Sequence, residues 1–217
     1  MVSSRLGAFQ REVLEALFAR VDESVFLTGG AALAGFHLGH RATDDLDLFT
    51  LDEGSFSRLR YVVADAAAAI GADLQVRQDA PGFRRYAMVR GSDVLVVDTV
   101  LERAPQLVPQ KPMVGSVRID PPAEILANKL TALAGRMEER DIIDVMYLER
   151  AGYRVEDALP GALAKDGGAT PATLAWLLSE VSIPEGAKLP AETPPAEARA
   201  FIADMIVRLR RCALPPA

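Results

Sequence analysis

Apolar residues near the start of the chain recur at the spacing of an amphipathic helix, and this pattern predicts a first helix. The next segment, SVFLT at residues 24–28, is rich in β-branched and aromatic residues and predicts a short strand. Gly29 and Gly30 break that strand, and residues 31–38 predict a short helix that ends near Gly39. The residues of the first apolar face are Leu6, Phe9, Val13, Leu14, Leu17 and Phe18.

The pattern then alternates between strands and helices. Residues 45–49 predict a second strand, and residues 55–70 predict a helix that ends at Gly71. Three further strands are predicted, separated by the turn-like sequences DAPG and GSD, at residues 74–77, 83–90 and 94–101. These elements together predict an α/β fold in which helices flank a mixed sheet.

The pattern changes to helices alone near Arg118. The sequence PPAEILANKLTALAGRMEERDIIDVMYL predicts two successive helices, and further helices are predicted at residues 155–164, 171–181 and 195–209. The proline-rich segment 183–195 predicts a loop or linker. We therefore divide the chain into an α/β core, residues 1–117, and a C-terminal helical region, residues 118–217.

Composition and charge narrow the class of protein. Half of the 217 residues are hydrophobic, enough for a sizeable core, and the formal net charge of −6 argues against a broad basic nucleic-acid footprint. The single cysteine, Cys212, excludes an intramolecular disulfide and a cysteine zinc site. The first residues lack the apolar run of a signal peptide, and no apolar run is long enough to span a membrane. We expect a cytoplasmic protein without a membrane partner.

The chemistry of the chain is concentrated in the sequence DDLDLF. On a strand, side chains alternate between faces, so Asp45 and Asp47 point one way while Leu46 and Leu48 point into the core. Two neighbouring carboxylates repel each other, and a divalent cation removes that cost. Mg²⁺ prefers oxygen ligands, usually one or two carboxylates together with substrate phosphates.

A third acid, Asp98, lies inside the otherwise apolar strand predicted at residues 94–101. A carboxylate there is costly unless it is paired or bound to a metal. If this strand lies beside the Asp45–Asp47 strand, the three acids converge in a two-metal arrangement, with ions ~3.5–4 Å apart. The alternative is that Asp98 is a strand-end acid paired with an arginine.

The two glycines fit the same site, because they follow a strand and precede a helix. Backbone amides at such a corner bind phosphate, glycine allows close approach, and Thr28 adds a hydroxyl. No GK[ST] sequence follows, so this is not a Walker loop. Taken alone, the glycines fit a plain tight turn, and the two aspartates fit a solvated surface or a helix cap. The combination of all these features is much less common.

The combination resembles the nucleotidyltransferase superfamily, whose core signature is a GG or GS turn, a DxD or DxE strand and a third acid on a later strand. More narrowly, GGAALAGFHLGHRATDDLDLF is similar to the AbiEii/AbiGii toxin family, the MenT-like nucleotidyltransferases. The matching residues are Gly29, Gly30, Arg41, Thr43, Asp44, Asp45, Leu46 and Asp47.

The second half carries further motifs of that family, in which a lysine precedes an RDxxD pair. The matching residues are Lys129, Arg136, Arg140, Asp141 and Asp144, so the resemblance covers roughly residues 26–148. Lys129 and Arg136 can share a helix face and, if they face the carboxylates, would bind the triphosphate. Asp141 and Asp144 can share a face of the next helix, and an ordinary Arg140–Asp144 salt bridge is an equal alternative. A solvated helix lysine is the alternative for Lys129.

The resemblance implies an enzyme that transfers NMP from an NTP to an acceptor hydroxyl, with Mg²⁺ or Mn²⁺ held by Asp45, Asp47 and Asp98. It implies nucleotide binding by Thr28, Gly29, Gly30, Arg41, Lys129, Arg136, Asp141 and Asp144, in a cleft that the helical region completes. It implies a toxin that acts on RNA, at the tRNA 3′ end, in a toxin–antitoxin or phage-defence system, with a cognate antitoxin as partner. The alternatives are transfer to a small molecule or a protein, and a non-catalytic nucleotide-binding module.

Several other residues have ordinary structural interpretations. His37 and His40 are poorly spaced for a metal across a glycine and are better read as structural or loop histidines. The pair Arg84–Arg85 predicts a solvated face, with contact to an RNA backbone as the alternative.

Overall fold

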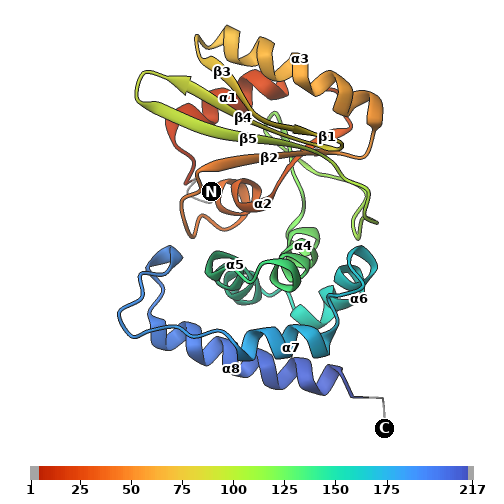
Figure 1. The fold of residues 1–217 in the computed structure, drawn as a ribbon, viewed down its shortest axis with the longest axis vertical. Coiled ribbons are helices and arrows are strands. Elements are labelled where there is room, and N and C mark those ends of the chain that lie inside the picture. The colour runs from red at the N-terminus through yellow and green to blue at the C-terminus, as the bar shows by residue number, and fades with distance from the viewer. Residues whose placement is uncertain (1–4, 215–217) are drawn as a thin grey trace. The chain divides into compact units, whose positions relative to one another are not determined.

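The computed structural model describes residues 5–214, and they form two compact units. The first unit comprises the chain up to residue 103 together with residues 110–121. The second comprises residues 104–109 and the chain from residue 122 onward. Each unit is described by itself below (Figure 1).

The first unit is built on a five-stranded mixed sheet, which confirms the predicted fold class. Its strands run in the order β1-β2-β5-β4-β3, and only the β2–β5 pair is parallel. The parallel pair lies inside the sheet and joins the first two strands to the later three-stranded meander. The strands are β1 (Val25–Thr28), β2 (Asp45–Thr50), β3 (Asp73–Ala80), β4 (Phe83–Arg90) and β5 (Asp93–Leu101).

Two helices, α1 (Ala8–Phe18) and α3 (Glu53–Ala69), cover one face of the sheet (Figure 1). The N-terminus of α3 is capped by Asp52, whose Oδ1 accepts a hydrogen bond from the Ser55 amide at 2.6 Å. Leu46 and Leu48 of β2 are fully buried, whereas the aspartates that alternate with them are only partly buried. The apolar face of the sheet therefore packs against α1 and α3, and the acidic side chains lie on the other face.

The connection from β1 to β2 starts as a helix at the first glycine, not two residues later as the sequence predicts. The α-helical turn α2 (Gly29–Ala32) continues directly into a π-helical turn, η1 (Leu33–His37). Gly29 has a φ of 66°, a left-handed conformation that glycine adopts without a steric penalty. The chain thus turns sharply at the end of β1.

A second difference lies in residues 102–120, for which the sequence predicts no element. This segment contains a small hairpin of β6 (Met113–Val114) and β7 (Val117–Arg118). It then adds Ile119 beside Leu27 in a parallel bridge at the edge strand β1. The bridge brings Asp120 next to the glycine corner.

The second unit is helical, as predicted. In it α4 packs against α5, α6 and α7, and α7 packs against α8. The buried core includes Ile125, Leu130 and Leu133 of α4. Within residues 5–214, no helix is both long enough and apolar enough to cross a membrane. The elements are α4 (Pro122–Gly135), α5 (Glu139–Arg150), α6 (Val155–Lys165), α7 (Pro171–Ser179), the 3₁₀ turn η2 (Pro190–Glu192) and α8 (Pro195–Cys212).

Candidate active site

A row of polar residues crosses four adjacent strands on the face of the sheet opposite α3. Thr28 is the register partner of Asp47, Asp47 of Asp98, and Asp98 of Arg85. Residues directly opposite each other in a sheet project from the same face. Asp45 lies two positions before Asp47 and shares that face. The structure therefore brings the three acids expected from the sequence together.

Arg85 completes this row; it is exposed, as the sequence predicts, and it also pairs with one of the acids. Its Nε donates to Asp98 Oδ1 at 2.8 Å, and its Nη2 donates to Asp98 Oδ2 at 2.7 Å. Asp98 is 4% exposed, so the guanidinium satisfies a buried carboxylate. Hydrogen bonding and charge from Asp98 raise the pKa of Arg85, and the charges of Asp45 and Asp47 act in the same direction.

The neighbouring Arg84, by contrast, does not lie on the predicted solvated face. It is 6% exposed and donates from Nη1 to the Phe56 carbonyl of α3 at 2.8 Å. Its guanidinium also stacks over the Phe56 ring, 4.2 Å from the centroid. Arg84 is therefore buried on the helix-covered face, and only Arg85 belongs to the acidic row.

The glycine corner lies against the acids. A Cβ on Gly29 would be 2.1 Å from Asp47 Oδ2, a distance that no side chain tolerates. A Cβ on Gly30 would be 2.9 Å from Arg41 Nη2 and 3.0 Å from Thr43 Oγ1. Glycine is needed at residue 29 because Asp47 fills the space that a side chain would occupy, whereas a side chain at residue 30 would have to displace the ends of Arg41 and Thr43.

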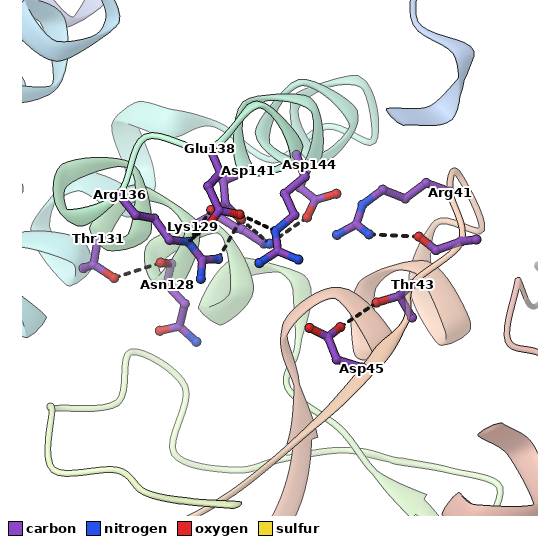
Figure 2. Close-up of polar contacts among 12 residues, drawn as sticks. Arg41, Thr43, Asp45, Asn128, Lys129, Thr131, Arg136, Glu138, Asp141 and Asp144 are labelled. Atoms are coloured by element: carbon purple, nitrogen blue, oxygen red, sulfur yellow. Dashed lines mark hydrogen bonds and ion pairs between the residues drawn. The ribbon is translucent and has the colours of Figure 1, made fainter. Parts of the chain in front are cut away.

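Thr43 and Arg41 lie in the loop that follows the corner and leads into β2. The Thr43 hydroxyl donates to Asp45 Oδ1 at 2.9 Å, and Arg41 Nη1 donates to the Ala42 carbonyl at 2.9 Å (Figure 2). The hydroxyl orients one of the two β2 carboxylates. The residues of the sequence motif thus contact one another, from Gly30 through Arg41 and Thr43 to Asp45.

Thr28 contacts a largely buried cluster of Asp120, Lys111 and His37, which the sequence analysis did not predict. Its hydroxyl donates to Asp120 Oδ2 at 2.5 Å, and the Lys111 ammonium lies 2.8 Å from Asp120 Oδ1. The Lys111 and Asp120 side chains are only 4% and 1% exposed. His37 Nε2 lies 2.7 Å from the Asp120 carbonyl oxygen, and burial lowers the pKa of His37. No local signal marks Asp120, because only the Ile119–Leu27 bridge brings it here.

In the second unit, Lys129 of α4 lies between two aspartates of α5 (Figure 2). Its Nζ is 2.6 Å from Asp141 Oδ1 and 2.7 Å from Asp144 Oδ2. The lysine side chain is 8% exposed and both aspartate side chains are 0% exposed, so Lys129 is not a solvated helix lysine. Arg136 Nε also contacts Asp141, at 2.9 Å from Oδ2, while its own side chain is 48% exposed.

Opposing effects act on Asp141. Burial acts to raise its pKa, but the charges of Lys129 and Arg136 and their hydrogen bonds outweigh burial, so the pKa is lowered. Asp141 is therefore held ionised, and the two cations and two carboxylates of this cluster balance in charge. The arrangement joins four residues of the lysine and RDxxD motifs into one unit.

The donor chemistry of the β2 acids fits a hard divalent cation. Asp45 and Asp47 offer carboxylate oxygens on one face, and the partly exposed side chains can be reached by a ligand. Among residues 5–214, no group of three or more His, Cys, Asp or Glu side chains has the spacing to hold a metal ion. Two carboxylates completed by other oxygens, such as those of substrate phosphates, are a ligand set that Mg²⁺ commonly takes.

Several solved structures share the fold of this chain. The chain is similar to JHP933 from Helicobacter pylori, with 21% identity, a TM-score of 0.56 and coverage of 94% of this chain and 91% of that one. A candidate nucleotidyltransferase from H. pylori gives 18% identity, a TM-score of 0.54 and 93% coverage of both chains. The antibiotic-resistance factor ANT(2'')-Ia gives 15% identity, a TM-score of 0.52 and coverage of 73% of this chain and 92% of that one. The fold is that of the nucleotidyltransferases.

The family follows from the sequence match. Residues 12–211 match the family described as nucleotidyl transferase AbiEii toxin, type IV TA system, and the chain belongs to this family. The expected resemblance is confirmed, and the protein is a nucleotidyltransferase of the toxin–antitoxin class. Membership implies a cognate antitoxin. No curated protein sequence matches the chain.

Proposed function

We propose that this protein is a Mg²⁺- or Mn²⁺-dependent enzyme that transfers NMP from an NTP to a hydroxyl group of RNA, at the tRNA 3′ end. The observation that carries the proposal is the row in which Asp47 and Asp98 lie side by side, with Asp45 on the same face and Gly29 against Asp47. Carboxylates gathered beside a glycine corner suit a cation and the phosphate chain that the cation binds. A tRNA substrate would place the reaction in the cytoplasm.

Asp45 and Asp47 would hold the cation, which when bound offsets the negative charge of the phosphates. Thr43 orients Asp45 through its hydroxyl, so that the carboxylate is fixed before the substrate arrives. Gly29 and Gly30 allow the corner to lie against Asp47, Arg41 and Thr43, and backbone amides of the corner would bind the triphosphate beside the Arg41 cation. Thr28 supports the corner through Asp120.

The second unit would contribute to nucleotide binding through Lys129, Arg136, Asp141 and Asp144. The half-exposed Arg136 is the member of the cluster that a phosphate reaches most easily. Asp141 and Asp144 hold the Lys129 ammonium in one place. A fixed, partly desolvated cation is a strong partner for charge that develops on a phosphate.

The proposed reaction is attack of the acceptor hydroxyl on the α-phosphorus of the NTP. The acceptor hydroxyl oxygen forms a bond to the α-phosphorus, the bond between that phosphorus and the bridging oxygen breaks, and pyrophosphate leaves with the electron pair. The hydroxyl proton passes to a carboxylate of the acidic face. The products are an RNA longer by one nucleotide and pyrophosphate.

The test is incubation of the purified protein with Mg²⁺, each α-labelled NTP in turn, and total tRNA, followed by gel separation. We expect label in the tRNA band with wild type and none with Asp47→Asn. The matched control is Asp93→Asn, which removes an exposed acid from β5 with the same change in charge. This control should label tRNA as wild type does.

The same gels separate the alternatives. If the label migrates with an added hydroxyl compound or with protein, the acceptor is that small molecule or protein and not RNA. Absence of label from every NTP on every acceptor, by a protein that still binds nucleotides, would favour a non-catalytic binding module.

A further inference from the structure

Arg85 neutralises the buried Asp98 carboxylate, but much of its guanidinium also remains exposed on the acidic face of the sheet. We propose that the Arg85 guanidinium, held by Asp98, binds the phosphate chain of the NTP in place of a second divalent cation. This inference rests on the proposed function. It also changes the expected role of Asp98, which becomes a positioning residue for Arg85 rather than a metal ligand.

Both carboxylate oxygens of Asp98 accept hydrogen bonds from Arg85. The two hydrogen bonds, at 2.8 and 2.7 Å, form a parallel fork between a guanidinium edge and a carboxylate. The Asp98 side chain is only 6% exposed, so few further partners can approach it. The three-acid, two-cation arrangement would require this fork to open and a buried carboxylate to change partner.

Arg85 keeps most of its binding capacity. Guanidinium carries five N–H donors, and the fork to Asp98 uses only two of the N–H groups. The side chain is 47% exposed, eight times the exposed fraction of its partner, so the rest of the guanidinium is accessible. Its Cζ lies 5.6 Å from the centroid of the Phe83 ring, which supports the guanidinium from a second direction.

The charges of the row favour one divalent cation. Asp45, Asp47 and Asp98 carry three negative charges and Arg85 carries one positive charge, which leaves a net charge of −2. The Asp45 and Asp47 charges are close enough to Arg85 to raise its pKa together with Asp98. One divalent cation neutralises this set, and the guanidinium then supplies a second positive group for the same anionic ligand.

Planar, bidentate recognition of phosphate is the chemistry to which arginine is best suited. A guanidinium that one carboxylate already orients needs little reorganisation when phosphate arrives. Asp98 therefore does two things in this arrangement: it fixes the direction of Arg85, and it lowers the cost of placing a cation beside the metal position.

The experiment separates cation binding from nucleotide binding. Mn²⁺ affinity without nucleotide is measured by electron paramagnetic resonance, and the affinity for each NTP with Mn²⁺ is measured by equilibrium dialysis. We expect Arg85→Gln and Asp98→Asn each to weaken NTP binding by roughly tenfold or more, the loss typical of a charged hydrogen-bond pair. We expect Mn²⁺ affinity to stay within about twofold of wild type in both, and to be lost in Asp47→Asn.

The matched control is Arg90→Gln, which breaks the same type of fork on the same strand. Arg90 donates to Glu12 of α1 from both terminal nitrogens, at 2.8 and 2.7 Å, so it faces the helices and not the acids. This variant should keep wild-type affinity for both ligands. The double variant Arg85→Gln with Asp98→Asn removes the pair together, leaves no unpaired buried charge, and should bind NTP no more weakly than either single variant.

Two outcomes would overturn the inference. Loss of Mn²⁺ binding in Asp98→Asn, as in Asp47→Asn, would make Asp98 a metal ligand. Unchanged NTP affinity in the folded Arg85→Gln variant or in the double variant would make Arg85 a structural counterion only. If the wild-type protein bound neither Mn²⁺ nor any NTP, the proposed function itself would be wrong. That result is distinguishable from the two outcomes above, because both of those require a wild-type protein that binds these ligands.

Discussion

The Cα of Gly29 lies so close to Asp47 that a methyl group added to it would meet the Asp47 carboxylate at 2.1 Å. The glycine directly follows β1 and the aspartate lies within β2, and the two strands are antiparallel neighbours. The corner and the acid therefore fit each other. The position of Asp47 depends on the absence of a side chain at residue 29.

Replacement of Gly29 by alanine should disable the cation site as well as strain the backbone. The left-handed φ of 66° costs an alanine about 1–2 kcal/mol, and the added methyl group must also displace the Asp47 carboxylate. We expect Gly29→Ala to lose Mn²⁺ affinity and NMP transfer. Urea denaturation measures the stability, and electron paramagnetic resonance measures the cation.

Gly91 supplies the control for this substitution. Its φ is 60°, and a Cβ there would meet nothing within 4 Å. Gly91→Ala should therefore have the backbone cost of about 1–2 kcal/mol and keep Mn²⁺ affinity. Equal Mn²⁺ affinity in the two alanine variants would show that the contact between residue 29 and Asp47 does not matter.

A second prediction concerns the buried pair that supports Thr28. Asp120→Asn would leave the Lys111 ammonium, 4% exposed, without its carboxylate, and breaking such a pair costs about 3–5 kcal/mol. Thr28→Val removes only the hydroxyl donor and should cost about 1–2 kcal/mol. Urea denaturation at neutral pH gives both values, and Thr28→Ser is the control because it keeps the hydroxyl. A stable Asp120→Asn variant would mean that Lys111 can turn to water.

Local periodicity made much of the acidic face predictable. The alternation in DLDLF places its acids on one face and its leucines on the other wherever the strand lies, and the structure has this pattern. The glycine corner was also predictable, because two glycines after a strand favour a turn. Both features depend on neighbours in the sequence.

The partner of Asp98 could also have been found from the sequence. β4 and β5 form a hairpin with Gly91 and Ser92 as a two-residue loop, and a loop of fixed length sets the register of its strands. Counting back from Arg90 and Asp93 pairs Arg85 with Asp98. The solvated-face interpretation holds for Arg85, whose side chain is 47% exposed, and fails for Arg84, because neighbouring residues of a strand point to opposite faces of the sheet.

Other features depend on contacts that no local pattern encodes. Asp120 reaches Thr28 only because the segment after β7 adds a bridge to the edge strand β1. Lys129 reaches both Asp141 and Asp144 because the chain reverses between α4 and α5, where Met137 adopts a φ of 45°. Sequence spacing predicted that the two aspartates share a face, but not which cation they hold.

A third prediction separates the structural role of Lys129 from its proposed role in binding. Lys129→Met would remove the ammonium between two fully buried aspartates, while Arg136 would still contact Asp141, and we expect a loss of about 3–5 kcal/mol. Adding Asp144→Asn should recover part of this loss, because one buried negative charge is removed with the positive one. Lys188→Met, at an exposed position, should change stability by less than about 0.5 kcal/mol. If the double variant were folded and still bound NTP as wild type does, Lys129 would be a structural residue alone.

The last prediction concerns acid sensitivity. Burial alone would raise the pKa of Asp141, but Lys129 and Arg136 lower it below its usual value of 3.8, so folding favours the ionised carboxylate. The resulting stabilisation is complete above the unfolded-state pKa and is lost as the pH falls through the lower folded-state value. The free energy of unfolding should therefore decline steeply below about pH 4. Asp141→Asn should be less stable than wild type at pH 7 and show a shallower decline, because its side chain does not titrate. Parallel pH profiles of the two proteins in urea denaturation would mean that Asp141 has the same pKa in the folded and unfolded states.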